Sequence, residues 1–466
     1  MYRFRSVKNL IGEYQELEKQ QIYFASLDEL NDPMEGTRRY FWQGDRIVWE
    51  NLLKHYLLCL EHVIFQTRLL PDNKTITKKD IPIYKSEKDL PTDRYKDRIQ
   101  RIKDHFFSDR FVQSYLQFII CNPNKIYLEE MYVHLKILSG NALKAIIEID
   151  AQSGLIPYIE NTQTKELENT IGVDFPSVGD ELYENQYGEL IEFLFGVLKS
   201  WDNELLQMYI DNPKLQSVSI EFPQMYLDSV VELTYPKAYV ACFMDNCSNS
   251  SIWGTYGNNH TGVCLKFKTV NSESNPLLPL KTIVGYSSRG NMNDYRDFPL
   301  QPIEYTSDFN ELDFFRNIGR IPMQQLEEQW YTGENGELSI CGEHIFSNVE
   351  EWRNQHWSAY QRAYLKKIPD WRHEREYRII LSSSIGLFDK PGDRLLEYKF
   401  NNLEAIIFGM KTPKEAKAEI IQIVKRKCEE IGRKEFEFYE MEYSIRKKEL
   451  YPRKIVSLKT SFEGEK

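Results

Sequence analysis

The chain has 466 residues, of which 41% are hydrophobic, 13% aromatic and 28% charged, and its formal net charge is −11. This composition supplies enough apolar surface for two or three packed domains and excludes a chain that is disordered throughout. The negative charge disfavours a protein that coats nucleic acid over its whole surface.

The compartment is inferred from what the sequence lacks. No apolar run approaches the roughly 18 residues of a membrane-spanning helix, and charges interrupt the first eight residues, so we expect neither a secretory leader nor a membrane partner. The 7 cysteines are scattered and odd in number, which fits a reducing compartment. The predicted location is therefore the cytoplasm.

The first 36 residues predict a strand, a helix, a second strand and an acidic loop. The strand expected over 2–6 alternates aromatic and basic residues, and apolar residues recur at helical spacing over 9–21. The strand at 22–26 leads into the loop at 27–35, where Pro33 prevents a helix.

Residues 40–235 change character. Helical periodicity with polar faces recurs over 45–65, 95–120, 127–138 and 182–208. We interpret 40–235 as a mostly helical insertion into a core domain built from 1–39 and 236–466. An independent helical domain is the alternative, and the sequence does not distinguish the two.

The rest of the chain returns to strands. We expect strands at 238–244, 263–268, 282–286, 302–306, 371–380, 403–409 and 435–443, with helices at 250–257, 312–330, 349–366 and 412–432. The predicted fold class is α+β, with a mixed central sheet that the N- and C-terminal segments form together. From 411 to 466 there are 15 Lys and Arg against 11 Asp and Glu, a local excess of +4. Solvated helix surface or a basic face for RNA or phosphate would each explain this excess.

The stretch from Trp371 to Ile380 is the strongest candidate for a site. On a strand, Glu374, Glu376 and Arg378 would share one face. Such a row of charges is costly to bury, yet it runs into apolar residues typical of a core. Cys242, Cys247, His260 and Cys264 lack the close ligand pairs of structural zinc sites, so we expect no metal.

Several separated motifs, taken in order, resemble a bacterial family of unknown function. They are an aromatic-Arg-Ser strand start, Asn-Asp-Pro-x-Glu, Trp-x-x-Tyr, His-x-Gly-x-Cys and Trp-x-x-Glu-x-Glu-x-Arg, and they run from Tyr2 to Arg378. Members of that family often occur near phage-defence genes and mobile elements. The resemblance implies a toxin-like or abortive-infection effector, with a partner protein of a defence system among its interactors.

The order of an N-terminal Arg, an aromatic strand and a late Glu-x-Glu is also similar to ADP-ribosyltransferases. That resemblance implies NAD as a small-molecule nucleotide substrate and a protein or RNA acceptor. Glu376 would stabilise the oxocarbenium-like transition state, Glu374 would orient the acceptor or act as base, and Arg5 would clamp the pyrophosphate. Tyr23 or Tyr256 would stack on nicotinamide. The remaining candidate substrate-binding residues are Ser6, Ser26, Asn31, Asp32, Glu35, Trp253, His260 and Arg378.

Three other interpretations use the same residues. Arg5 and Arg378 would pair with Glu374 and Asp32 in a purely structural ion network. Alternatively, Asp32, Glu35 and the two late glutamates would gather Mg²⁺ for nucleic-acid cleavage, with Lys366 or Lys367 nearby. The third is a non-catalytic sensor whose helical part binds a phage or host protein.

Overall fold

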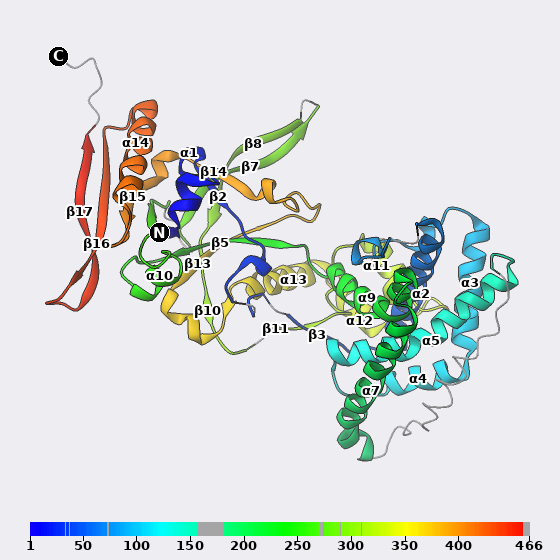
Figure 1. Ribbon diagram of the computed structural model, residues 1–466. Coiled ribbons are helices and arrows are strands. Elements are labelled where there is room, and N and C mark those ends of the chain that lie inside the picture. Colours follow the sequence, from blue (N-terminus) through cyan, green and yellow to red (C-terminus); the bar gives the residue numbers. More distant parts are fainter. Residues whose placement is uncertain are drawn as a thin grey trace. The chain divides into compact units, whose positions relative to one another are not determined.

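The computed structural model describes residues 1–32, 34–36, 38–71, 74–156, 181–270, 272, 275–288, 290–308 and 310–459 (Figure 1). It confirms the α+β class. The chain divides into two compact units. The first comprises 1–37, 237–309 and 359–466, and the second comprises 38–236 and 310–358.

The second unit differs from the expected insertion at 40–235 by one later segment, residues 310–358. The strand β11 (Asn310–Asp313) pairs in parallel with β3 (Arg38–Trp42). Trp330, Tyr331 and Trp352 from the same segment are buried in the second unit's core. Apolar packing therefore places residues 310–358, with which the C-terminal third of the chain begins, in the helical unit.

The first unit is built around a mixed sheet that has eight strands in the described part of the chain. Its spatial order is β17-β16-β15-β6-β1-β5-β13-β9, and only β15 and β16 run parallel to each other. The strands are β1 (Tyr2–Arg5), β5 (Ala238–Met244), β6 (Val263–Phe267), β9 (Gln301–Pro302), β13 (Glu376–Ser382), β15 (Leu403–Phe408), β16 (Glu435–Ser444) and β17 (Glu449–Lys459). The N-terminal strand thus lies at the centre, between strands from later in the chain.

Each face of this sheet has its own core. One face packs on α14 (Lys414–Ile431) and on a second sheet of order β2-β14-β7-β8. Those strands are β2 (Gln21–Tyr23), β14 (Leu395–Tyr398), β7 (Leu277–Ser287) and β8 (Gly290–Pro299). The other face packs on the short helix α10 (Ser250–Thr255), whose Ile252 and Trp253 cover Phe4 of β1.

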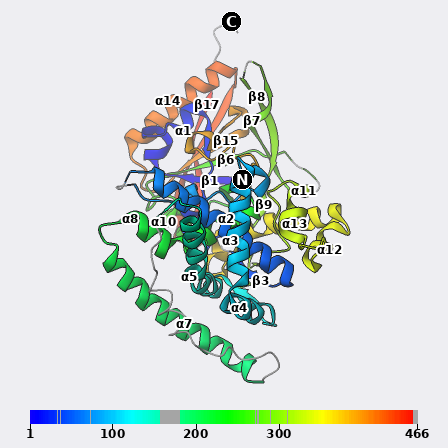
Figure 2. The same ribbon diagram turned by 90° about the vertical axis from the view of Figure 1, so that its right-hand side faces the viewer.

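The second unit is mainly helical and has a single large hydrophobic core in its described part. Its long helices α2, α5 and α7 are visible in Figure 2. The helices are α2 (Arg46–Leu69), α3 (Asp93–Ser108), α4 (Arg110–Ile120), α5 (Leu128–Gln152), α7 (Glu181–Met208), α8 (Pro213–Gln216), α9 (Phe222–Val230), α11 (Met323–Leu326) and α12 (Ile340–Phe346). A small sheet joins β4 (Ile126–Tyr127) to β3 and β11. The chain passes back to the first unit within α13 (Val349–Tyr364).

The strand predicted over 371–380 is wrong in its first half. Residues Pro369–Glu374 form a 3₁₀ helix, and β13 begins only at Glu376. Arg375 separates the two with a left-handed backbone (φ 49°), which no strand residue adopts. Pro369 is the first residue of the 3₁₀ helix, and its ring fixes a φ angle that suits a helix. Because Glu374 belongs to this helix, it does not share a strand face with Glu376.

Other predicted elements also need correction. The helix expected over 312–330 is instead β11 followed by short helical turns. The helix expected over 95–120 is divided because Asp109 caps α4, accepting hydrogen bonds from the backbone N–H groups of Phe111 and Val112. The helix expected over 9–21 is a single π-helical turn followed by α1 (Glu16–Lys19). The long hairpin β7–β8 replaces the short strand expected at 282–286.

Crossing a bilayer takes a helix that is both long and apolar, and no helix in the described ranges combines the two properties.

Candidate active site

A buried ionic cluster lies at the start of β13. The ammonium of Lys367, on β12 (Lys366–Lys367), lies 2.7 Å from Glu35, 2.7 Å from Glu374 and 3.2 Å from Glu376. The guanidinium of Arg378 places Nε 2.6 Å from Oε1 of Glu376 and also binds Glu35. None of the five side chains is more than 2% exposed. We call them the ionic cluster.

Local folding brings these five side chains together. Glu376 and Arg378 are two residues apart on β13 and so share one face of the sheet. The 3₁₀ helix before β13 carries Glu374, and β12 pairs with β10 (Glu304–Tyr305) to place Lys367 beside it. Glu35 comes from the loop after β2, where its backbone N–H binds the carbonyl of Asp32.

The cluster contains three carboxylates and two cations, so full ionisation would leave one excess negative charge. Burial raises the pKa of Glu374 above its ordinary value of 4.5. Burial also opposes ionisation of Glu376, but Arg378 and Lys367 outweigh it and lower the pKa of Glu376 to about 2. Two neighbouring carboxyl groups with oppositely shifted pKa values are the arrangement that acid–base chemistry uses.

Glu374 is also the member with unused hydrogen-bonding capacity. Its Oε1 atom is buried and has no hydrogen-bond partner among the described residues. A proton on this carboxyl group would leave the cluster neutral, in agreement with its raised pKa. Tyr256 lies close by, and burial raises the pKa of its phenol, with further contributions from the charges of Glu374 and Glu376.

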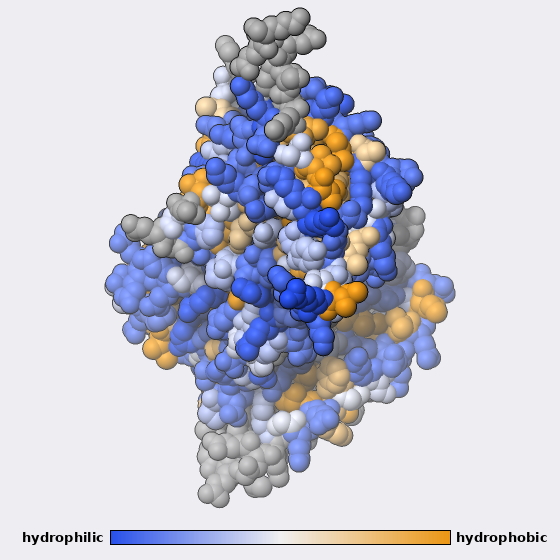
Figure 3. All heavy atoms as spheres, turned by 90° about the vertical axis from the view of Figure 1, so that its left-hand side faces the viewer, coloured by the Kyte–Doolittle hydropathy of each residue, from blue (hydrophilic) through white to orange (hydrophobic). Residues whose placement is uncertain are grey.

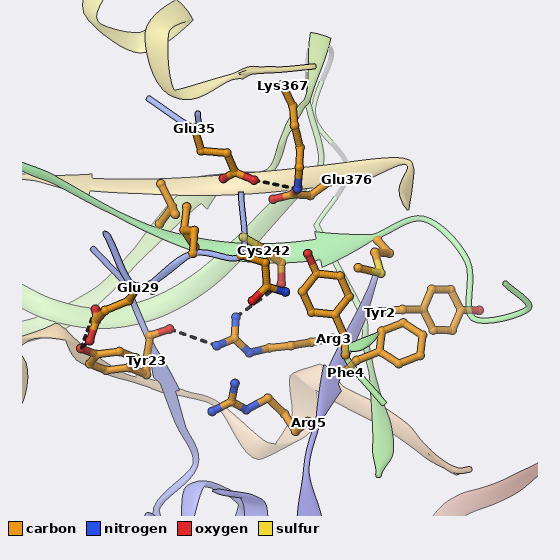
Figure 4. A pocket seen from close by; sticks show the side chains of 16 residues that line it. Tyr2, Arg3, Phe4, Arg5, Tyr23, Glu29, Glu35, Cys242, Lys367 and Glu376 are labelled. Atoms are coloured by element: carbon orange, nitrogen blue, oxygen red, sulfur yellow. Dashed lines mark hydrogen bonds and ion pairs between the residues drawn. The ribbon is translucent and has the colours of Figure 1, made fainter. Parts of the chain in front are cut away.

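A pocket of about 180 Å³ opens beside the cluster, where β1 and β5 separate. Tyr2 and Met244 are the one pair of residues in register between β1 and β5. Farther along β5, Val240 pairs with Ala25, which follows β2, and no longer with β1. Figure 4 shows Glu376, Lys367 and Glu35 on one side of Cys242, with Arg3 and Arg5 on the other. The lining is Tyr2, Arg3, Phe4, Arg5, Tyr23, Ala25, Glu29, Leu30, Asn31, Glu35, Val240, Cys242, Met244, Tyr256, Lys367 and Glu376.

The two arginines of β1 supply positive charge to this pocket. The guanidinium of Arg5 is occupied by Glu16, with Nε 2.6 Å from the carboxylate. Arg3 is only 7% exposed and donates to two backbone carbonyls, those of Tyr23 at 3.0 Å and Cys242 at 3.4 Å. No carboxylate of the described residues lies within ion-pair distance of Arg3. Burial lowers the pKa of Arg3 to about 10, and the charge of Arg5 adds to this effect.

Arg5 and Glu376 reach the same pocket from different faces of the sheet. Tyr2 is in register with Met244, and Met244 is in register with Glu376, so these three share a face. Strand alternation puts Arg3 and Arg5 on the other face. They line the same pocket as Glu376 because the sheet is open between β1 and β5.

The predicted site residues fall into three groups. Six line the pocket, namely Arg5, Tyr23, Asn31, Glu35, Tyr256 and Glu376. Glu374 and Arg378 belong to the ionic cluster behind it. Five do not line it and have structural contacts or lie elsewhere, namely Ser6, Ser26, Asp32, Trp253 and His260.

The pairs proposed for a structural network are also replaced. Arg5 binds Glu16 instead of Glu374, and Arg378 binds Glu35 and Glu376 instead of Asp32. Asp32 accepts a hydrogen bond from the backbone N–H of Met34. Pro33, part of the Asn-Asp-Pro-x-Glu motif, lies outside the described residues.

Sequence reasoning missed two central side chains. Arg3 was expected only as part of a short strand, although its alternation with Phe4 and Arg5 already placed it beside Arg5. From the sequence, Lys367 is expected only as a neighbour of a Mg²⁺ site. Its role as the common partner of three glutamates depends on the β10–β12 pairing, which two-residue strands do not reveal in a sequence.

The carboxylates are poorly disposed to hold a divalent cation. Glu35, Glu374 and Glu376 each bind Lys367, and two of them also bind Arg378, so Mg²⁺ would have to displace a buried ammonium or guanidinium. In the described ranges, no group of His, Cys, Asp and Glu side chains has the arrangement of a metal site.

One family model is similar to part of the chain. A family model described as a protein of unknown function (DUF2971) matches residues 252–379. This span includes Tyr256, β12 and the ionic-cluster residues of β13, and it leaves out the N-terminal motifs and most of the helical unit. No curated protein matches the chain. No solved structure matches it either.

Proposed function

We propose that this protein is a transferase that cleaves the bond between nicotinamide and ribose in NAD and passes ADP-ribose to an acceptor. The observation that carries the proposal is the pair of carboxyl groups with oppositely shifted pKa values beside a pocket that also contains two arginines. The pocket therefore has an ionised carboxylate, that of Glu376, in the same lining as the guanidinium groups of Arg3 and Arg5. A substrate that carries a phosphate and develops a cation elsewhere matches this pair of groups.

Glu376 has the properties that the bond-breaking step requires. The bond between ribose C1′ and the nicotinamide nitrogen breaks, and the electron pair leaves with nicotinamide. The ribosyl group becomes oxocarbenium-like, and an ionised carboxylate beside it lowers the energy of that state. A pKa of about 2 keeps Glu376 ionised at neutral pH, and its contacts with Arg378 and Lys367 hold it in place.

Glu374 and Tyr256 would complete the transfer. A nucleophilic atom of the acceptor forms a bond to C1′ and loses its proton. Glu374, in its ionised form, takes up protons more readily than Glu376 because burial raises its pKa. Glu374 does not line the pocket, whereas Tyr256 lines the pocket and lies beside Glu374. Tyr256 is therefore the group through which Glu374 acts on a bound acceptor.

Arg3 is better suited than Arg5 to hold the pyrophosphate. Arg5 already has the carboxylate of Glu16, whereas Arg3 is a buried cation without a carboxylate partner among the described residues. An uncompensated buried charge is unfavourable, and a phosphate oxygen would neutralise it through charge-assisted hydrogen bonds. Figure 4 shows the two guanidinium groups one above the other, both directed toward Tyr23.

The size of the pocket limits how much of the substrate it encloses. Pockets for small molecules usually have about 300–1,000 Å³, and this one has about 180 Å³. We therefore expect one part of NAD to be enclosed and the rest to lie over the mouth of the pocket. The acceptor, a protein or an RNA, and the phage-defence or toxin-like role come from the family resemblances alone.

Incubation of the purified protein with NAD, with and without cell lysate, tests the proposal. Release of nicotinamide and transfer of label from the adenine-labelled dinucleotide are expected for the wild type. Arg372→Ala is the matched control, because Arg372 is exposed and lies two residues from Glu374. Its activity should equal that of the wild type. If the wild type releases no nicotinamide under either condition, the proposal is wrong.

A non-catalytic sensor or interaction module is the second candidate. One observation favours it: the ionic cluster is almost completely satisfied by its own members, as a structural network would be. In that case Glu376→Gln would leave the cellular phenotype intact in every variant that folds. If folded Glu376→Gln loses both the cellular phenotype and nicotinamide release, the non-catalytic module is excluded.

A further inference from the structure

A second hollow lies in the first unit, away from the ionic cluster. It has a volume of about 800 Å³ and is bounded by the loops before and after α10, by the loop between β15 and α14, and by the β16–β17 hairpin. His260, Met410, Lys411, Tyr443 and Lys448 are among its lining residues. We call it the hairpin groove. It shares no lining residue with the pocket at Glu376.

The charge of the hairpin groove is positive. Lys411 and Lys448 have no carboxylate within ion-pair distance among the described residues. The one acidic side chain in the lining, Glu449, lies 3.6 Å from the ammonium of Lys447, which compensates it. Arg446 precedes these lysines in the hairpin turn. The local excess of +4 over residues 411–466 is therefore concentrated, in part, along this groove.

The groove also offers an exposed aromatic ring. Tyr443 is 51% exposed, although its register partner Leu450 is buried against the core beside α10. Tyr451 also lines the groove, and its hydroxyl donates to Glu442 at 3.0 Å. Figure 3 shows the face of the molecule that carries β16 and β17, where hydrophilic side chains predominate.

We infer that the hairpin groove binds single-stranded nucleic acid. Phosphates would lie near the ammonium groups of Lys411 and Lys448, and one base would stack on Tyr443. Positively charged grooves with exposed aromatic rings bind single strands in this way, because every base has a stacking face. A run of carboxylates such as polyglutamate would use the lysines but has no ring to stack on Tyr443. This inference does not depend on the chemistry proposed for Glu376.

The experiment measures fluorescence anisotropy of labelled 12-nucleotide strands of uridine and of thymidine, without NAD, over a range of salt concentrations. Binding with a micromolar Kd near 0.1 M salt is expected for at least one strand, and the stronger of the two identifies RNA or DNA as the source. The double variant Lys411→Gln/Lys448→Gln should reduce the slope of log K against log salt by about 1.4, since each phosphate contact on a single strand contributes about 0.7. Tyr443→Leu should weaken binding at least about fivefold and leave the slope unchanged.

The control Lys268→Gln/Lys390→Gln removes the same charge from exposed positions of the first unit outside the groove. This control should reduce the slope of log K against log salt by less than about half of the reduction expected for Lys411→Gln/Lys448→Gln. Equal effects of the two double variants would overturn the inference, and so would unchanged affinity for Tyr443→Leu. Binding of polyglutamate at the same affinity, or tighter binding of a duplex of the same length, would also overturn it. The thermal stability of every variant is measured alongside its binding, so that a misfolded variant is recognised.

Discussion

The guanidinium of Arg378 lies against the carboxylate of Glu376, with Nε 2.6 Å from Oε1, and both side chains are buried. A second nitrogen of Arg378 binds Glu35, and its NH1 group donates to the carbonyl of Tyr364 at 2.9 Å. This arginine therefore connects β13 to the loop after β2 and to the end of α13. The position of the candidate catalytic carboxylate depends on it.

Replacement of Arg378 should severely destabilise the protein. Arg378→Met leaves two buried carboxylates with Lys367 as their one remaining cation, and removal of one partner of a buried ion pair costs about 3–5 kcal/mol. The free energy of unfolding in urea measures this loss. The pair between the exposed Arg375 and the half-buried Asp245 provides the comparison, because Asp245→Asn should cost no more than about 1 kcal/mol. Equal costs for the two variants would show that the ionic cluster does not stabilise the fold.

The two glutamates should shape the pH dependence of stability in opposite directions. The pKa of Glu376 falls from 4.5 to about 2 on folding, so its contribution is present above pH 4.5 and is lost as the pH falls toward 2. The pKa of Glu374 is raised on folding, so its contribution is present below pH 4.5 and is lost as the pH rises through the folded value.

Measurement of the free energy of unfolding from pH 3 to pH 8 tests these signs. The stability of the wild type minus that of Glu376→Gln should increase with pH by about 2 kcal/mol over this range and level off above pH 4.5. The same difference for Glu374→Gln should decrease with pH above 4.5. Parallel curves for the two variants would contradict the assignment of an ionised Glu376 and a protonatable Glu374.

Arg3 should matter for binding more than for folding. Arg3→Met removes a buried cation that has two carbonyl partners and no described carboxylate, so the free energy of unfolding should fall by no more than about 1–2 kcal/mol. Affinity for ADP-ribose, measured by titration calorimetry, should fall at least tenfold, which is about 1.4 kcal/mol. Arg3→Lys should retain part of the affinity, because the charge stays while the bidentate geometry is lost.

An unchanged affinity in Arg3→Met would exclude Arg3 as the phosphate-binding residue. If Arg5→Met instead abolishes binding, the phosphate is held by Arg5 and must displace Glu16 from it.

Local patterns in the sequence predicted the α+β class and most strands of the central sheet, but not β17, which follows the last expected strand. Runs such as Ala238–Met244 and Leu403–Phe408 are apolar because both faces of the sheet are covered, and such runs are recognisable without a structure. The joining of the first strand to later strands was expected because strand patterns resume after residue 236. The strands themselves, unlike this pairing, depend on residues that are close together in the chain.

The candidate site was less predictable because it depends on distant pairings. The sequence predicts that Glu374 lies on a strand. Arginine seldom adopts a left-handed backbone, so nothing in the sequence marks the turn at Arg375. The surroundings of Arg3 and the contact between Lys367 and Glu35 depend on segments more than 200 residues apart, whereas Glu374 and Glu376 lie within nine residues of Lys367. Alternation on β1 did predict that Arg3 and Arg5 lie on the same side.

The most direct measurement of the central claim is the rate of nicotinamide release from NAD by the wild type and by Glu376→Gln, with Arg372→Ala as control. Glu376→Gln keeps the size of the side chain but removes the charge that stabilises the oxocarbenium-like state, so release should fall by at least about a hundredfold. Circular dichroism and thermal unfolding must show that the variant is folded. Release by the wild type and the control, but not by folded Glu376→Gln, is the predicted result. Equal release by folded Glu376→Gln, or none by the wild type, would contradict the proposed role of Glu376.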